Sequence, residues 1–306
     1  MESADRRGWD GLIPDVLGSI FSKLSLEDVL TVVPSVCKSW HKVVMGPYCW
    51  QSVDIEQWSD QQSQLDRIER MLRLLITRSN GSMTKLSVSR LQYDHLFSFI
   101  ADNSRSLQIL RLTRSKISDS IVEQLADRLS GLTFLDLSYC DQIGARALEA
   151  IGKQCKSLGG LCFNMHPIDV LGKPSQKDEA RAIATTMTKL KHLELTYIRL
   201  NTTSVVEIIS NCLNLEFIDL RGCWDVELDN SWLKDKFSRL KVLGPHVTDH
   251  LEIHCCWECE DSSYYSDSVY DYESWDEFDD DDDGRLEIIL YDGQGEGSDN
   301  AWPQSP

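Results

Sequence analysis

The sequence predicts an α/β protein in which a helical unit is followed by a solenoid of strand–helix repeats and an acidic, disordered tail. Residues 12–50 carry apolar side chains at helical spacing, with capping residues between the runs. From Met83 onward, an apolar-x-x-apolar-x-apolar pattern returns at a nearly constant period. The last stretch is too acidic to collapse into a core. We expect the following segments: a flexible N-terminus at 1–8, the helical unit at 9–54, a helical linker at 55–82, repeats at 83–250 and the tail at 251–306.

The helical unit begins at a proline, which suits the first turn of a helix because its missing N–H has no partner there. Pro14 and the acidic Asp15 mark this start. Ser25 and Asp28 form a capping box that begins a second helix. Pro34 is expected to end that helix, because proline keeps the residue before it out of helical geometry. The sequence therefore predicts three short helices.

A unit of this size cannot bury so many large apolar side chains by itself, because small domains hide only part of their surface. Another molecule or the following domain must cover the rest. One interpretation is a plain helical hairpin that packs on the next domain. The other follows from a resemblance in the residues themselves.

The order of Leu12-Ile13-Pro14, an apolar helix, Val29-Leu30, Val36 to Trp40 and a closing Trp50 resembles the F-box. Ile13 stands where that family usually has leucine, and Ser25 where it often has proline. The resemblance implies docking on a Skp-type adaptor, which is held by a cullin scaffold. It also implies that an apolar cluster makes this contact. The expected adaptor-binding residues are Leu12, Ile13, Pro14, Leu17, Ile20, Phe21, Leu24, Leu30, Val33, Val36, Cys37, Trp40 and Trp50.

The repeat decides the architecture of the middle of the chain. Its copies start 24, 25, 26, 32, 25 and 25 residues apart. This period is typical of leucine-rich repeats, in which each coil holds a short strand and then a helix. Six to seven coils are predicted, with starts at Met83, Leu107, Leu132, Leu158, Leu190 and Leu215 and a partial copy at Leu240.

Four cysteines stand at equivalent places in different coils. Cys140 and Cys223 follow a strand by three residues, and Cys155 and Cys212 precede the next start by three. A small thiol fits inside the bend of a coil, so packing is favoured over a metal site. The pattern resembles the cysteine-containing repeats that commonly follow an F-box. The overall layout is most similar to plant F-box/leucine-rich-repeat proteins with acidic C-termini.

Side chains that flank the buried strand positions are expected on the inner curve of the solenoid, because side chains alternate along a strand. This set is polar, with few charges, and indicates a protein partner rather than nucleic acid. The candidate client-binding residues are Ile109, Arg111, Phe134, Asp136, Asn164, His192, Glu194, Phe217, Asp219 and Arg221. The long step in the repeat holds an insertion at 165–180, which is either a client contact or a tolerated surface loop.

The net charge of −18 belongs to the tail. Thirteen acidic and no basic residues lie between Glu258 and Asp283, and four acids and one arginine follow. This leaves about −2 for residues 1–257. The tail either keeps the protein soluble or binds a basic partner. The latter fits an alternative function, in which an acidic repeat protein masks a basic nuclear partner such as histones.

Several functions find no support in the sequence. No apolar run is long enough to span a membrane, and the polar N-terminus is unlike a secretory signal. Ten cysteines then indicate reduced thiols in the nucleus or cytosol. No nucleotide-binding, hydrolase or protease motif is present, so neither a cofactor nor catalytic residues are expected.

Two further patterns favour ordinary structural roles. Arg67, Arg70 and Arg73 lie off the apolar row of a helix and are interpreted as a solvated face rather than a nucleic-acid site. A cluster near the tail has no second pair of ligands, so no metal site is expected there. It consists of His254, Cys255, Cys256 and Cys259.

The resemblance implies a non-catalytic subunit of an SCF (Skp–cullin–F-box) ubiquitin ligase. The F-box would bind the adaptor and the repeats would bind a client, which is then ubiquitinated and degraded by the proteasome. Such a receptor acts by positioning, which makes a second-order reaction effectively intramolecular.

Overall fold

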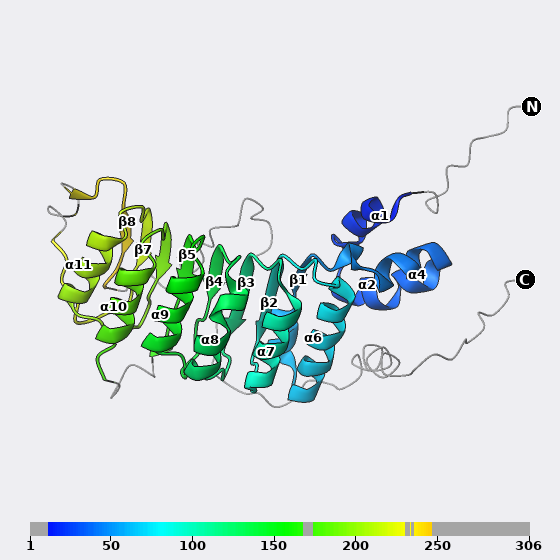
Figure 1. The fold of residues 1–306 in the computed structure, drawn as a ribbon, viewed down its shortest axis with the longest axis horizontal. Helices are drawn as coiled ribbons and strands as arrows, with labels where there is room; N and C mark the ends of the chain where they lie inside the picture. The colour runs from blue at the N-terminus through cyan, green and yellow to red at the C-terminus, as the bar shows by residue number, and fades with distance from the viewer. Residues whose placement is uncertain (1–11, 168–173, 230–232, 234–235, 247–306) are drawn as a thin grey trace, which may run out of the picture.

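The computed structural model describes residues 12–167, 174–229, 233 and 236–246. A helical unit, residues 12–49, lies at one end of an array of parallel strands and helices that occupies residues 52–246 (Figure 1). The predicted fold class is confirmed. The predicted N-terminus at 1–8, the tail at 251–306, the cluster around His254 and residues 168–173 of the insertion lie outside the described residues.

The helical unit contains four α-helices and a 3-10 helix, rather than the three helices expected. Ser25 begins the second helix as predicted, since its hydroxyl accepts a hydrogen bond of 3.1 Å from Asp28 N. Pro34 does not end a helix but lies in the first turn of α3, where it needs no N–H partner. The elements are α1 (Pro14–Phe21), α2 (Leu26–Thr31), α3 (Val33–Val36), α4 (Lys38–Met45) and the 3-10 helix Pro47–Cys49.

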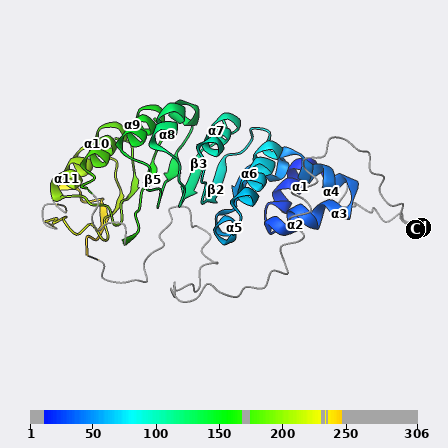
Figure 2. The same ribbon diagram turned by 90° about the horizontal axis from the view of Figure 1, so that it is seen from below.

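The array is built on one parallel sheet of eight strands that follow each other in chain order. Helices α6 to α11 lie along the outer side of the curved array and the strands along the inner side (Figure 2). The strands are β1 (Ser52–Asp54), β2 (Lys85–Ser89), β3 (Ile109–Thr113), β4 (Phe134–Asp136), β5 (Gly160–Cys162), β6 (His192–Glu194), β7 (Phe217–Asp219) and β8 (Lys241–Leu243). The helices are α5 (Glu56–Gln61), α6 (Leu65–Ser79), α7 (Asp94–Asn103), α8 (Asp119–Leu125), a 3-10 helix (Ala126–Leu129), α9 (Ala145–Gln154), α10 (Lys177–Thr186) and α11 (Thr202–Asn211).

The parallel sheet begins one strand before the first predicted repeat, which starts at Met83. β1 pairs with β2, with Val53 opposite Leu86, so the segment predicted as a linker at 55–82 belongs to the first coil. Val53 is the one buried residue of β1. Trp50, Val53 and Ile55 follow the apolar-x-x-apolar-x-apolar pattern and are buried, but these residues were assigned to the end of the helical unit and to the linker.

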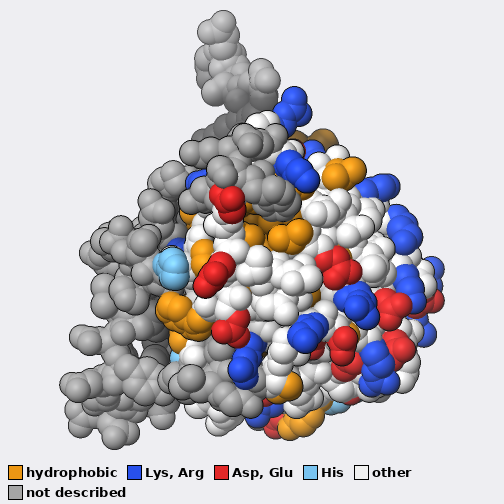
Figure 3. All heavy atoms as spheres, turned by 90° about the vertical axis from the view of Figure 1, so that its left-hand side faces the viewer, with side chains coloured by type: hydrophobic (Ala, Val, Ile, Leu, Met, Phe, Trp, Pro, Cys, Tyr) orange, Lys and Arg blue, Asp and Glu red, His pale blue; other side chains and the backbone are white. Residues whose placement is uncertain are grey.

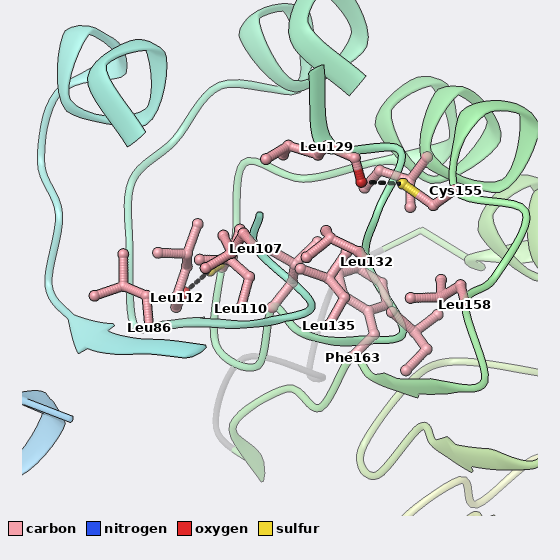
Figure 4. Close-up of a cluster of buried hydrophobic side chains, with 14 of the residues drawn as sticks. Leu86, Leu107, Leu110, Leu112, Leu129, Leu132, Leu135, Cys155, Leu158 and Phe163 are labelled. Carbon is pink, nitrogen blue, oxygen red and sulfur yellow. Dashed lines mark hydrogen bonds between the residues drawn. The ribbon is translucent and has the colours of Figure 1, made fainter. Parts of the chain in front are cut away.

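The repeat positions form the core of the array, as predicted. Leu86, Leu110 and Leu135 occupy equivalent positions of neighbouring strands and are almost fully buried (Figure 4). Each such row continues from coil to coil, so every coil is covered by its neighbours.

The four repeat cysteines are buried and free, which confirms the packing role. Each thiol donates a hydrogen bond to a carbonyl of the preceding coil; Figure 4 shows Cys155 Sγ at 3.1 Å from Leu129 O. Burial raises the pKa of Cys140, Cys155 and Cys223 to about 12, so these thiols stay protonated. The other three bonds are Cys140 to Leu112 O, Cys212 to Met187 O and Cys223 to Leu195 O.

A well-packed junction joins the helical unit to the array. Trp50 is 2% exposed and donates its indole N–H to Val44 O at 2.8 Å. The Arg78 guanidinium of α6 lies 5.8 Å from the centre of the Trp50 ring, on the other side of the junction. Thr84 N donates to Gln51 O at 2.7 Å, which ties β1 to the start of the next strand.

None of the helices in the described ranges combines the length and the apolar character that crossing a bilayer requires. Figure 3 looks onto the end of the array that carries α11. Outside the grey atoms, side chains of both charges are interspersed on this face, with small apolar spots between them. Part of the insertion forms the start of α10, which begins at Lys177.

Candidate partner-binding surfaces

Large apolar side chains are exposed mainly on the helical unit. Of the twelve that the described residues expose, eight lie within residues 12–45. On and beside α1 they recur at the spacing of one helical face. We call these eight residues the apolar face: Leu12, Ile13, Val16, Ile20, Leu24, Val32, Val36 and Met45.

The other side of α1 holds the helical unit together. Leu17 is fully buried, and the ring of Phe21 lies 4.9 Å from the Trp40 ring. Gly18 allows α1 to approach the 3-10 helix, because a Cβ at this position would lie 2.4 Å from Tyr48 O. The apolar face is therefore supported by a rigid layer beneath it.

The thirteen predicted adaptor-binding residues divide into three groups. Leu12, Ile13, Pro14, Ile20, Leu24 and Val36 are exposed, and Cys37 and Trp40 are half-buried. The structure contradicts surface roles for five, which form the interior of the unit: Leu17, Phe21, Leu30, Val33 and Trp50.

The physical reason is that helical spacing marks an apolar helix but does not separate its inner side from its outer side. Val16, Val32 and Met45 were missed as exposed positions for the same reason. Val16 and Val32 each have an exposed apolar residue at i+4, Ile20 and Val36, and this spacing is the signal that could have found them.

On the inner face of the array, aromatic rings from three strands form a row. The His192 ring stacks on Phe217 with centroids 4.6 Å apart and an interplanar angle of 11°. Phe134 lies on the other side of His192 at 6.5 Å. The Arg111 guanidinium lies 5.2 Å from the Phe134 ring centre, within the range of a cation–π contact.

A row of carboxylates runs beside the rings, and each has a partner. Asp219 accepts hydrogen bonds from Arg221 Nε at 3.0 Å, and this contact raises the pKa of Arg221. Burial raises the pKa of Asp136 to about 6, against hydrogen bonds from Ser138 that lower it. Burial alone would also raise the pKa of Glu194, but hydrogen bonds to its carboxylate reverse the shift and the net pKa is lowered.

Helix α5 covers part of the inner face, where the alternation of side chains alone predicts exposed residues. Ser89 donates to Asp60 Oδ1 at 2.6 Å, and Thr113 donates to Glu56 Oε1 at 2.7 Å. Ser87 and Ser89 are fully buried as a result. In Figure 2, α5 lies beside β2, at the end of the inner face that is next to the helical unit.

The predicted client-binding residues lie on the inner face, as side-chain alternation required. Ile109, Arg111, Asp136, Asn164, Glu194, Phe217 and Arg221 are half-buried. The structure contradicts direct exposure of three others, Phe134, His192 and Asp219, which are 2–4% exposed. Neighbouring strands are so close that large side chains on one cover those on the next.

Two exposed aromatic residues at the edge of the array were missed by the sequence analysis. Tyr139 is 39% exposed and Trp224 is 60% exposed. Tyr139 has a φ of 62° and is stacked with the Arg114 guanidinium at 5.4 Å. Its position, two residues after the last repeat leucine of its coil, is the signal that locates it.

The basic side of α6 differs from the expected solvated face at one position. Arg67 is 5% exposed and belongs to the interior. Arg73 remains partly exposed, where it pairs with Glu69 at 2.8 Å and lies over the Phe99 ring. Stacking and ion pairing within the chain account for the position of Arg73.

Comparison with known proteins places this arrangement. The F-box-like family profile matches residues 14–56, and a leucine-rich-repeat profile matches residues 131–152. F-box protein FBW2 of Arabidopsis thaliana is 54% identical over 279 residues, which cover 91% of this chain and 88% of that protein. The chain belongs to the family of F-box proteins with leucine-rich repeats.

Other relatives of this F-box protein are more distant. F-box protein SKIP19 of Arabidopsis thaliana is 32% identical, over 90% of this chain and 89% of its own length. The putative F-box/LRR-repeat protein 23 of the same plant is 31% identical, over 79% of this chain and 54% of its own. A chain in the crystal structure of the Rad7 and Elc1 complex in yeast shares 18% identity, with a TM-score of 0.45 over 57% of this chain and 44% of that one.

Family membership supports a general role as a substrate adaptor in ubiquitin ligation. An F-box implies binding to a Skp-type adaptor, and members of this family are typically non-catalytic. From here on, the helical unit is called the F-box.

Proposed function

We propose that this chain is the substrate-recognition subunit of an SCF ubiquitin ligase that acts in the nucleus or cytosol. The F-box binds a Skp-type adaptor and, through it, a cullin. The array binds a client protein, which is ubiquitinated and then degraded by the proteasome.

The apolar face of the F-box carries this proposal. Ile13 is 63% exposed, Val36 55% and Met45 49%, although each side chain favours burial by about 1.5–3 kcal/mol when fully covered. Such a concentration of exposed apolar surface in one small unit marks a protein-binding site. A helical, apolar adaptor surface is the partner that this face fits.

The array contributes the client side of the proposal. Its inner face beyond β2 offers partly exposed polar and aromatic side chains from successive strands, with Arg111 and Phe217 at the edges of the aromatic row. Solenoids use such curved surfaces to bind partners. The carboxylates there are already paired, so client contacts will depend on shape and hydrogen bonding more than on charge.

The test is a charge placed on the apolar face of the full-length chain. Ile13→Glu with Ile20→Glu should weaken binding to a purified Skp-type adaptor by about 100-fold or more, measured by titration calorimetry. Both side chains are exposed, so the thermal unfolding of the chain should not change. Leu30 is a poor choice for this test, because it is 4% exposed and a charge there would unfold the F-box.

A control is Leu213→Glu, which adds one negative charge to an apolar side chain that is 77% exposed on the array. It should bind the adaptor like the original chain. Unchanged adaptor affinity of the Ile13→Glu, Ile20→Glu variant would refute the assignment. In cells with the proteasome inhibited, proteins retained by the original chain should carry ubiquitin, and those retained by this variant should not.

A further inference from the structure

Three side chains with different metal-binding atoms meet on the inner face of the array. Cys162 Sγ, a ring nitrogen of His192 and a carboxylate oxygen of Glu194 lie within 4.8 Å of one another. Cys162 is opposite Glu194 in the pairing of β5 with β6, and Gly160 is opposite His192. Cys162 precedes His192 by 30 positions and Glu194 by 32, and the parallel register of β5 with β6 brings it beside them.

The neighbouring side chains hold the imidazole in place. His192 is 3% exposed, between the stacked ring of Phe217 and the tilted ring of Phe134. Phe134 fits there because Gly160 has no side chain; a Cβ on Gly160 would lie 2.5 Å from Phe134 Cδ2. A ligand fixed in this way loses little conformational entropy when it binds an ion.

The carboxylate is held from behind by an amide. Asn164 Nδ2 donates to Glu194 Oε2 at 3.1 Å and to Ser138 Oγ at 3.1 Å, and its Oδ1 accepts from Thr196 N at 2.9 Å. The other oxygen, Oε1, lies 2.7 Å from His192 Nε2. Hydrogen bonds of this kind orient the ligands of metal sites.

We infer that Cys162, His192 and Glu194 bind a divalent ion of the zinc class on the inner face of the array. Thiolate, imidazole and carboxylate are the three ligand types that Zn²⁺ takes, with bonds of about 2.0–2.3 Å. These bond lengths put tetrahedral ligands roughly 3–4 Å apart. The three ligand atoms, which lie within 4.8 Å of one another, are already close to this spacing. Mg²⁺ and Ca²⁺ prefer oxygen ligands and fit this set poorly.

When the ion binds, it replaces the hydrogen bond between His192 and Glu194. The Cys162 thiol releases its proton to solvent and binds the ion as a thiolate. Three protein ligands leave the fourth position of a tetrahedral ion open. That position is available to water or to a side chain of a bound partner. The site involves no residue of the F-box, so it is independent of adaptor binding, although His192 and Glu194 also belong to the predicted client-binding residues.

The test is metal titration of the reduced full-length chain. Cys255, Cys256 and Cys259 are first changed to Ser, so that the tail thiols do not bind the probe. Co²⁺ replaces Zn²⁺ as a spectroscopic probe, because a thiolate ligand gives it a charge-transfer absorption in the near ultraviolet. One equivalent should bind with this absorption, and excess Zn²⁺ should remove it.

Three variants in the same background decide the assignment. Cys162→Ser should abolish the charge-transfer absorption, whereas Cys223→Ser, which removes a buried thiol from another coil, should leave it unchanged. Asn164→Ala should weaken Co²⁺ binding about 10- to 100-fold through the loss of carboxylate orientation. Zn²⁺ should raise the Tm of the background chain but not of Glu194→Gln, which keeps the shape of the side chain.

Two results would overturn the site. One is a background chain without thiolate absorption at any Co²⁺ concentration, which would leave the three residues as a hydrogen-bonded cluster. The other is an unchanged absorption in folded Cys162→Ser protein. Adaptor binding should be unaffected in every variant, so failure here is separable from failure of the proposed function.

Discussion

Helix α1 of the F-box and helix α9 of the array bury one side each, but their outer sides differ. α1 buries Leu17 and Phe21 and exposes Val16 and Ile20. α9 buries Leu148 and Ile151, and its outer side carries charged residues such as the Lys153–Glu149 pair. The stacked coils of the array bury each other's apolar side chains, whereas the F-box leaves a set of apolar side chains exposed.

The two parts of the chain therefore differ in how much of their apolar surface the chain itself buries. In the array, each apolar row continues into the next coil, so added coils bury what earlier ones expose. The F-box has too few residues for a second apolar layer. Three substitutions test how far the contrast extends.

The largest effect is expected in the middle of the array. Leu161 is fully buried between Leu135 and Leu193 of the neighbouring strands, so Leu161→Ala should lower the free energy of unfolding by about 2–5 kcal/mol. Urea denaturation followed by circular dichroism measures this loss. Val16→Ala, on the exposed side of α1, should change it by less than about 0.5 kcal/mol. Equal losses would mean that Val16 is as well covered as Leu161 and would remove the contrast.

A smaller effect should localise to the F-box. Gly18→Ala puts a Cβ 2.4 Å from the backbone oxygen of Tyr48, so α1 must move away from the 3-10 helix. We expect a loss of about 1–3 kcal/mol and weaker adaptor binding, because the apolar face shifts with α1. Gly159→Ala in the array is the matched control, since its nearest atom would be 3.8 Å away. Hydrogen exchange should show faster opening in the F-box alone; opening spread over the array would show that the two parts unfold as one.

The smallest effect concerns pH and the inner face. Because burial raises the pKa of Asp136 from 3.8 to about 6, the folded chain binds this proton more tightly than the unfolded chain. The free energy of unfolding should therefore fall as the pH rises from about 4 to about 6. Asp136→Asn should remove this decline, because an amide does not titrate in this range.

The control for the loss of one negative charge is Asp141→Asn. Asp141 is exposed and lies five residues after Asp136. It should retain the decline between pH 4 and pH 6. If Asp136→Asn retains the decline as well, the titration belongs to another group of the inner face. Glu56 raises and Arg111 lowers the same pKa, so these are the next positions to change.

The fold was predictable where a period repeats. The leucine positions located the six strands from β2 to β7, and Ser25 and Asp28 located the start of α2. The first coil was missed because its repeat positions, Trp50, Val53 and Ile55, were assigned to the end of the helical unit and to the linker. Pro34 was misread because the same residue that ends a helix also begins one.

The exposed surfaces were predictable only in part, because sequence periodicity does not show which apolar side chains are covered by other elements of the fold. Leu17 and Ile20 belong to the same apolar run, yet the first is fully buried and the second is 38% exposed. Phe134 and His192 were placed on the correct face, but neighbouring side chains cover them. The meeting of Cys162 with His192 and Glu194 depends on strand register, which no local pattern contains.

The junction at Trp50 has a geometric consequence for the proposed function. The Trp50 side chain donates a hydrogen bond to Val44 O and packs beside Arg78 of α6. These contacts fix the orientation of the array relative to the F-box. A cargo held on the curved side would then be presented at one fixed angle and reach. Lysines on only one side of that cargo would come within range of the transferred ubiquitin, so selection among them would follow from this tryptophan.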